Sequence, residues 1–332
     1  MPDAESGTGT GHADAGAAPD GRPLPSWNEG AARAALLRFV DAVCRPGSPH
    51  ELPPDERIAV FAHDGTLWGE FPLPVHALFL GERIEQLARQ LPGLRERHPF
   101  SAFLQDDLPR LHGLGWRGIM QLALVAHAGV PLEIYARQAG DWLAAARHAW
   151  LGRPVAACTY QPQLELIALL RRHAFTCFIV TAGESTFVRA FAPSAYGIPA
   201  HQVIGTCVRT QVQLQPGIAE LVKLAQEERW NEREDKVRGI AAHIGRRPVL
   251  AFGNADRDLA MLRYVRAGPG PRLALLLHHD DGVREFAYDA GFALNPLDDA
   301  LERAAEFGLQ VVSMRDDWAT VFAPAGSEVR LR

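Results

Sequence analysis

The stretch R-I-A-V-F-A-H-D-G-T-L-W, from Arg57 to Trp68, decides the fold of this chain. Its first five residues, 57–61, form a short apolar run, which is typical of a strand buried on both faces of a parallel sheet. The run stops abruptly and the polar turn His63-Asp64-Gly65-Thr66 follows. Because ligands of open α/β sheets bind beyond the carboxyl ends of the strands, this turn is the first candidate for a functional site.

Three later apolar runs have the same character, and amphipathic helical patterns accompany them. Strand, polar loop, helix and strand in alternation predict a doubly wound α/β domain. We therefore expect a Rossmann-like three-layer sandwich with a parallel central sheet. The runs are 175–181, 248–252 and 272–278, and the helical patterns are 163–173, 185–196, 236–244 and 256–265.

The segment from Pro74 to about Trp150 departs from this alternation, because almost all of it has helical periodicity. We interpret residues 71–154 as a helical cap inserted between the first and second core strands. The α/β core then comprises residues 26–70 and 155–332. The expected cap helices are 75–90, 118–127 and 132–149.

The N-terminal part divides into a tail and a first helix. Ser26 and Glu29 form a capping-box pattern before an apolar periodicity that continues to about Cys44, so we expect a helix there. Residues 1–25 are rich in Gly, Ala and Asp, and a segment of this composition predicts a disordered tail.

The composition is that of a soluble globular protein, with 47% hydrophobic and 22% charged residues among 332. The net charge of −5 indicates no basic face, so nucleic acid is not an expected partner. No apolar run reaches the roughly 18 to 20 residues that span a bilayer, and no secretory signal is recognisable. We expect a cytoplasmic protein with buried, reduced thiols at Cys44, Cys158, Cys177 and Cys207. The oligomeric state is not indicated.

Polar side chains follow several of the expected strands and should meet at one edge of the sheet. Thr181 and Ala182 follow the second strand, Asn254, Asp256 and Asp258 follow the third, and Lys236 opens the helix before it. Carboxylate and amide oxygens are the ligands that Mg²⁺ prefers, whereas a lysine and a hydroxyl suit phosphate oxygens. The pattern predicts a site for phosphate and magnesium.

These four segments, in this order, resemble the motifs of the haloacid dehalogenase superfamily. F-A-H-D-G-T-L-W is similar to motif I, usually Asp-x-Asp-Gly-Thr, and G-N-A-D-R-D-L-A-M-L is similar to the acidic motif IV. Thr181 resembles the hydroxyl residue of motif II and Lys236 the lysine of motif III. The resemblance covers the chain after residue 26, places a C1 cap at the helical insertion, and is closest to phosphoserine-phosphatase-like hydrolases.

The resemblance implies an Mg²⁺-dependent phosphate monoester hydrolase that acts on a small phosphorylated molecule. In that mechanism the first carboxylate of motif I attacks phosphorus, and the second protonates the leaving group and then activates water. Asp64 corresponds to the acid/base. Thr181, Ala182 and Lys236 correspond to the phosphate site, and the metal ligands would be Asp64, Asn254, Asp256 and Asp258.

The nucleophile position holds Ala62, whose methyl group can neither attack phosphorus nor bind magnesium. We therefore expect little phosphatase activity and a weakened Mg²⁺ site. The alternative is a pseudoenzyme that binds or senses a phosphorylated ligand. A natural alanine and an engineered inactivation are equally consistent with the sequence. His63 as a substitute nucleophile is a minor alternative, and dehalogenation of a small acid would be equally impaired by Ala62.

Each assignment has a structural alternative. Asp64 could be the first residue of an Asp-Gly turn, and Thr181 could simply end a strand. Lys236 could be a solvated charge in a charged stretch. Asp256 and Asp258 could cap the next helix. The order of the four motifs favours the functional interpretation, least so for Asp256.

Several further side chains are candidates for the cleft. Trp68 and Glu70 directly follow motif I, so we expect them with His63 under the cap. The cluster His278-His279-Asp280-Asp281 follows the fourth apolar run and is equally consistent with the rim of the site and with a solvated loop. For the cap residues Trp116, Trp142 and Trp150 we expect core packing.

Overall fold

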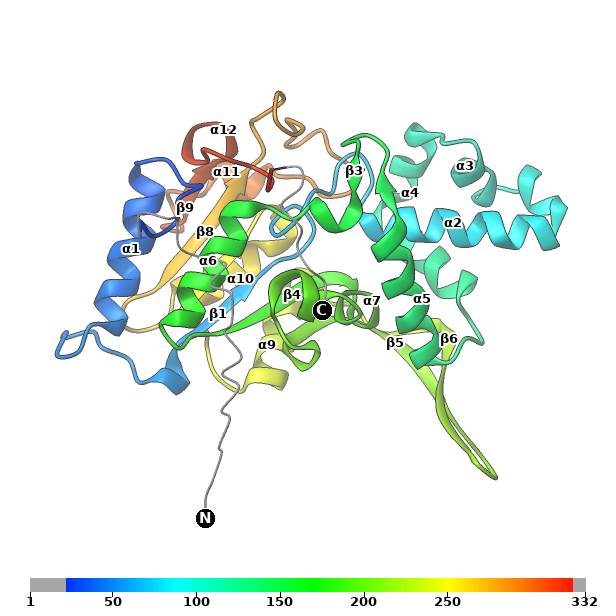
Figure 1. Cartoon of the computed structure of the whole chain (residues 1–332), viewed down its shortest axis with the longest axis horizontal. Coiled ribbons are helices and arrows are strands. Elements are labelled where there is room, and N and C mark those ends of the chain that lie inside the picture. Colours follow the sequence, from blue (N-terminus) through cyan, green and yellow to red (C-terminus); the bar gives the residue numbers. More distant parts are fainter. Residues whose placement is uncertain (1–21, 325–332) are drawn as a thin grey trace, which may run out of the picture.

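A computed structural model describes residues 22–324 and confirms the expected α/β sheet (Figure 1). Seven strands form one sheet in the order β6-β5-β4-β1-β7-β8-β9, and all neighbours run parallel except β5 and β6. The central strand β1 is the apolar run after Arg57. The strands are β1 Ile58–Phe61, β4 Thr176–Glu184, β5 Val203–Gln215, β6 Ile218–Arg229, β7 Leu250–Gly253, β8 Leu273–His278 and β9 Gln310–Ser313.

Helices cover both faces of this sheet, as the alternation predicts. Successive side chains of a strand point to opposite faces, so Phe61 packs in one apolar cluster and Val60 in the other. The first cluster includes helices α1 Ala31–Cys44, α6 Gln161–Arg172 and α7 Ser185–Arg189. The second includes α9 Glu234–Ile244, α10 Leu259–Arg266 and α11 Asp299–Glu302. Short helices α8 Ala192–Tyr196 and α12 Met314–Asp317 complete the core.

The inserted segment is a helical layer at one end of the sheet (Figure 1). In its first helix, Leu80, Ile84 and Ala88 recur every four residues and are buried, whereas the opposite side is polar. Leu80 and Ile84 form a separate cluster with apolar residues of the following helices. The elements are α2 Val75–Gln90, α3 Phe100–Leu104, α4 Leu108–Ala126, α5 Leu132–Ala145 and the small hairpin β2 Arg147–His148 with β3 Arg153–Pro154.

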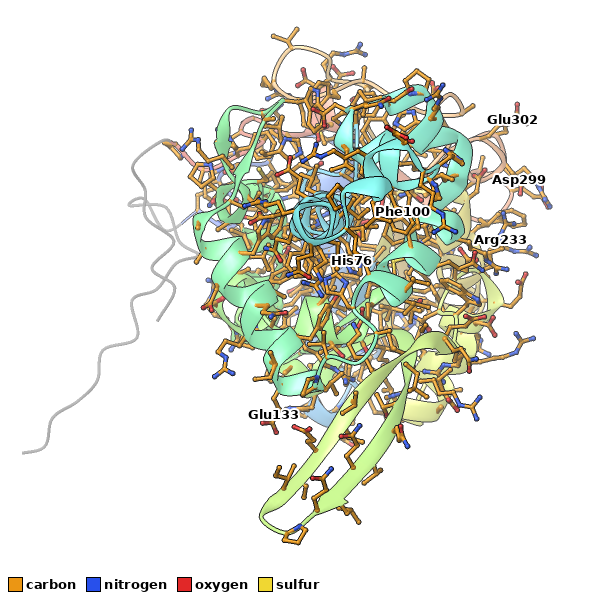
Figure 2. All side chains as sticks on the ribbon, turned by 90° about the vertical axis from the view of Figure 1, so that its right-hand side faces the viewer. His76, Phe100, Glu133, Arg233, Asp299 and Glu302 are labelled. Atoms are coloured by element: carbon orange, nitrogen blue, oxygen red, sulfur yellow. The ribbon has the colours of Figure 1, made fainter. Side chains whose placement is uncertain are left out.

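A long two-stranded ribbon, β5 with β6, connects the two layers. Its β5 strand joins the core sheet through β4, whereas β6 is hydrogen-bonded to the cap. In the cap contact, Gly129 N donates to the carbonyl of Lys223 at 2.8 Å, and Lys223 N donates to that of Val130 at 3.0 Å. Figure 2 views the cap face, where the ribbon projects beyond Glu133 at the start of α5.

A buried ion pair lies where ribbon, cap and core meet. The ammonium of Lys223 contacts the carboxylate of Glu184 at 2.6 Å, and neither side chain is more than 1% exposed. The same nitrogen lies 3.2 Å from the ring centroid of Tyr135, whose hydroxyl is 3.1 Å from Nε2 of His76. Figure 2 labels His76, which belongs to the first turn of α2. One charged group thus contacts the core strand β4 and the cap helix α5.

Several local expectations were wrong. Ser26 does not cap a helix, because its N–H and hydroxyl both donate to Glu165, and α1 begins five residues later at Ala31. Order starts before residue 26, since Leu24 is fully buried, whereas residues 1–21 of the expected tail lie outside the described residues. In the cap, α4 begins ten residues earlier than expected, α5 ends at Ala145, and Trp150 is 40% exposed.

Within residues 22–324, no helix is long and apolar enough to cross a bilayer. All four cysteines are free, with Cys158 and Cys177 buried and Cys44 and Cys207 half-buried.

The Lys223–Glu184 pair provides a test of this junction. We expect Lys223→Met to lower the free energy of unfolding by about 3 to 5 kcal/mol, because it leaves the Glu184 carboxylate buried without a counter-charge. Urea titration followed by circular dichroism measures the change.

The matched control is Arg209→Met on the same ribbon, whose ion pair with Glu228 is exposed and 4.0 Å long. Arg209→Met should lower the free energy of unfolding by less than about 1 kcal/mol. Adding Glu184→Leu to Lys223→Met should recover most of the loss, since no charge then remains buried. A loss as small as that of the control would contradict the structural role of the pair.

Candidate active site

A small cavity lies where the carboxyl ends of β1, β4 and β7 meet the cap. Its walls come from both the core and the cap, and it is partly open to solvent. The lining includes central residues of all four motifs and side chains from the cap and the C-terminal loop. The lining residues are Ala62, His63, Asp64, Glu70, Pro74, Trp116, Thr181, Ala182, Lys236, Arg257, Asp258, Leu294 and Asn295.

The loop after β1 presents Ala62 and Asp64 to this cavity. The ring of Trp68 donates to Oδ1 of Asp64 at 2.9 Å, and Nδ1 of His63 lies 3.6 Å from the same oxygen. Burial raises the pKa of Asp64, but His63 and the bond from Trp68 outweigh it and hold that pKa below its usual range. Asp64 is therefore a carboxylate at neutral pH, and no carboxylate stands beside it at residue 62.

His63 is buried among aromatic rings. Its Nε2 lies 3.1 Å from the hydroxyl of Tyr196, and its ring centroid is 4.6 Å from that of Trp68 and 5.6 Å from that of Phe191. This packing fixes the ring, and the Tyr196 bond occupies Nε2, so the environment does not favour attack by His63 on a ligand.

Gly65 allows the first loop to approach the loop after β7. Its φ of +71° favours glycine, and a Cβ atom there would lie 2.1 Å from Nδ2 of Asn254 and 2.2 Å from Oε1 of Glu70. The next residue, Thr66, donates its hydroxyl to Oδ1 of Asn254 at 2.7 Å. The two loops are thereby held side by side.

Thr181, Lys236 and Asp258 meet on the other side of Ala62. The ammonium of Lys236 lies 2.6 Å from Oδ1 of Asp258 and 2.8 Å from the carbonyl of Val180, and neither charged side chain is more than 2% exposed. Lys236 is therefore not a solvated charge. The Thr181 oxygen accepts the N–H of Gly183 at 2.9 Å, which leaves its hydrogen able to donate.

The carboxyl group of Glu70 forms four hydrogen bonds at the back of the cavity. Asn254 and Tyr288 donate to Oε1, and Nδ2 of Asn295 lies 2.9 Å from both carboxylate oxygens. Burial, followed by the charge of Asp64, raises the pKa of Glu70 to about 7, although the Asn295 bond opposes the shift. The carboxyl group of Glu70 thus joins the loops after β1 and β7 to the C-terminal loop.

His279 supports the first loop from behind. Its Nε2 donates to the carbonyl of Gly65 at 2.7 Å, and its Nδ1 lies 3.1 Å from Glu285, which also accepts the hydroxyl of Tyr160. Burial lowers the pKa of His279, but the carboxylate of Glu285 outweighs burial and raises it. Of the cluster 278–281, His279 therefore has a supporting contact with motif I.

Trp116 and Arg257 close the cavity from the cap side. The ring N–H of Trp116 donates to the carbonyl of Ala182 at 3.4 Å. The Arg257 guanidinium is 5.8 Å from the centroid of the Trp116 ring. Arg257 also donates to the carbonyl of Leu294. Gly115, just before Trp116, has φ +65° and ψ 169° and interrupts α4, which sets the direction of the tryptophan.

The structure places most of the sequence-derived candidates together, with three exceptions. Asp256 does not line the cavity, because Oδ1 accepts the N–H groups of Asp298 and Ala300. Asn254 does not line it either, because its side chain bonds to Thr66 and Glu70. Trp68 stands behind Asp64 rather than at the cavity wall. Sequence reasoning missed Arg257, Trp116 and Asn295. Only Arg257 carried a signal, since it lies inside motif IV.

The residues that could bind a metal ion are already bonded to one another. Oδ1 of Asp258 contacts Lys236, and Oδ2 accepts the N–H groups of Asn254 and Ala255. The hydroxyl of Thr66 donates to the amide oxygen of Asn254. Among residues 22–324, Oδ2 of Asp64 accepts no hydrogen bond, each of the bonded oxygens keeps at most one lone pair, and no three His, Cys, Asp or Glu side chains are placed to share a cation. In this arrangement the residues do not fit Mg²⁺, which requires near-octahedral oxygen ligands.

Comparisons with known proteins agree with this geometry. The family model for haloacid dehalogenase-like hydrolases matches residues 59–263, more than half of the chain. No protein of curated function matches the sequence. A conserved protein of unknown function from Anaerococcus prevotii DSM 20548 has a similar structure, with a TM-score of 0.55 and 14% identity over 85% of this chain and 91% of that one.

Two further solved structures share less of the fold. A protein of unknown function from Bordetella pertussis Tohama I has 17% identity over 77% of this chain and 98% of its own, with a TM-score of 0.47. A phosphoserine phosphohydrolase-like protein from Francisella tularensis subsp. tularensis SCHU S4 has 12% identity over 79% and 95%, with a TM-score of 0.41.

The raised pKa of Glu70 predicts a pH dependence of stability. The folded protein holds the proton up to about pH 7, whereas the unfolded chain releases it near 4.5, so stability should fall as pH rises between these values. The loss attributable to Glu70 should approach about 3 kcal/mol. Urea unfolding at several pH values from 4.5 to 8 measures it.

Glu70→Gln should remove this part of the slope, because the amide does not titrate. Exposed Glu82→Gln on α2 serves as the control and should keep the wild-type slope. Parallel curves for wild type and Glu70→Gln would show that Glu70 is ionised throughout this range.

Proposed function

Because this chain belongs to the haloacid dehalogenase-like hydrolase family, we propose that its cavity binds the phosphate group of a small phosphate monoester. The observation that carries this proposal is the meeting of Asp64, Thr181, Lys236 and Asp258 around the methyl group of Ala62. The site would belong to a phosphohydrolase lineage, with hydrolysis strongly reduced by the missing nucleophile.

The side chains in the cavity suit the binding of a phosphate group. Lys236 has one N–H beyond its bonds to Asp258 and Val180, and Thr181 has a free hydroxyl hydrogen. Both would donate to phosphate oxygens. Asp64 would lie near the ester oxygen, where it could return a proton to the leaving group. Pro74 and Trp116 of the cap line the cavity, so a ligand there would lie between the cap and the core.

The missing step is attack on phosphorus. In the family's mechanism an aspartate occupies the position of Ala62 and forms a phosphoaspartate, which an alanine cannot do. Removing a nucleophile of this kind lowers hydrolase rates by about 10³ to 10⁶. Phosphatases of this family generally use Mg²⁺. In this chain most side-chain oxygens of the site already accept hydrogen bonds from protein groups.

A second candidate function is the binding or sensing of a phosphorylated ligand without turnover. Ala62 favours it, because every contact around the alanine is in place while the attacking group is lost. Both candidates require a phosphate in the same cavity, and they differ only in whether residual hydrolysis occurs.

Restoring the carboxylate tests the proposal. We expect Ala62→Asp to raise the hydrolysis of para-nitrophenyl phosphate in the presence of Mg²⁺ by at least about 10³-fold over the unchanged chain, which should turn over more slowly than about 1 per second. Release of para-nitrophenol measures the rate.

Ala62→Asn is the matched control, since it has the same size as aspartate but cannot attack, and should remain as slow as the alanine. Asp64→Asn added to Ala62→Asp should abolish the gain. If Ala62→Asp folds and binds phosphate without hydrolysing the ester, the sensing function is favoured. If neither protein binds phosphate, the proposal is wrong.

A further inference from the structure

The charges around the cavity suit an anion without a metal ion. Two cations, Lys236 and Arg257, line it together with the carboxyl groups of Asp64, Glu70 and Asp258. With aspartate in place of Ala62, two further negative oxygens would face a bound phosphate. Ala62 removes that repulsion, which a divalent cation would otherwise have to offset.

Of the two cations, Arg257 is the one to which the family motifs assign no role. Its guanidinium donates to the carbonyl of Leu294 and stands beside the Trp116 ring. Among residues 22–324 it has no carboxylate partner, whereas Lys236 is paired with Asp258. Because a guanidinium has five N–H donors in a planar fork, it can offer bidentate hydrogen bonds to phosphate.

The acidic side chains have little capacity left for a cation. A metal ion at Asp258 would have to lie beside the ammonium of Lys236, which is 2.6 Å from Oδ1, or displace a backbone N–H group from Oδ2. Glu70 faces donors only, from Asn254, Asn295 and Tyr288. The loops that would have to open are the ones that position Asp64 and Thr181.

We propose that this site binds phosphate dianion without a divalent metal ion, and that Arg257 and Lys236 supply the positive charge. This inference rests on the proposed phosphate site and adds to it a class of ligand chemistry: an anion held by side chains rather than by a metal bridge. Arg257 then contacts the phosphate from the side nearest the cap, opposite Lys236.

Isothermal titration with inorganic phosphate tests the metal requirement. The protein is dialysed against EDTA and titrated in EDTA or in 10-fold excess Mg²⁺ over protein, at one ionic strength. We expect dissociation constants that agree within about twofold, and no saturable heat with Mg²⁺ alone. Binding that appears only with Mg²⁺ would overturn the inference while leaving the phosphate site intact. No binding in either buffer would overturn the proposed function itself.

Substitution of Arg257 tests the source of charge. In EDTA, Arg257→Gln should weaken phosphate binding at least tenfold, and Arg257→Lys should lose less than Arg257→Gln because it keeps the charge. Arg45→Gln, an exposed change of equal charge at the end of α1, should have no effect beyond about twofold. A loss for Arg257→Gln no larger than that of Arg45→Gln would exclude Arg257 from the site.

Substitution at residue 62 tests the charge argument directly. Ala62→Asp should weaken phosphate binding in EDTA at least tenfold and recover it in Mg²⁺, since the new carboxylate both repels phosphate and provides a metal ligand. Ala62→Asn should bind phosphate equally in both buffers. Metal-independent binding by Ala62→Asp as tight as that of the unchanged chain would show that charge at this position does not decide the metal requirement.

Discussion

The buried contact between Lys236 and Asp258 is the interaction on which the rest of the site depends. It ties the helix α9 to the loop after β7 and, through the carbonyl of Val180, to β4. Two charges removed from water are costly unless their remaining bonding capacity is used, and here Asp258 also accepts two backbone N–H groups. The pair keeps the carboxyl ends of the strands at one place, whether or not a reaction follows.

The supporting structure around motif I is complete although the nucleophile is not there. His279 bonds to the carbonyl of Gly65, Asn254 bonds to Thr66, and Glu70 joins both to the C-terminal loop. These buried polar groups are satisfied by one another, which makes the arrangement stable as a unit. At residue 62 the side chain is a methyl group, and the contacts around it form one hydrogen-bonded unit in a chain of the haloacid dehalogenase-like hydrolase family.

Much of the fold could be predicted from the sequence, because buried parallel strands are continuous apolar runs and the motif residues directly follow them. The ribbon of β5 and β6 could not, since half of its residues are polar and the apolar side chains of its outer part, such as Val212 and Leu214, are exposed. Asp256 and Asp258 have the same local pattern, and only the tertiary contacts of their oxygens distinguish them. Trp116 and Asn295 come from segments that are distant in sequence from the motifs, so no local sequence pattern predicts their place in the site.

The ribbon has a mechanical consequence for the cap. A helical insertion that is joined to its core by two chain segments can rotate as a rigid body about them. Here a third connection exists, because β5 is part of the central sheet and β6 is hydrogen-bonded to the cap at Val130. Rigid-body swinging would shear the ladder between these strands. Any movement of the cap relative to the core should therefore come from torsion of the ribbon, with the outer layer twisting about its long axis while both ladders stay intact.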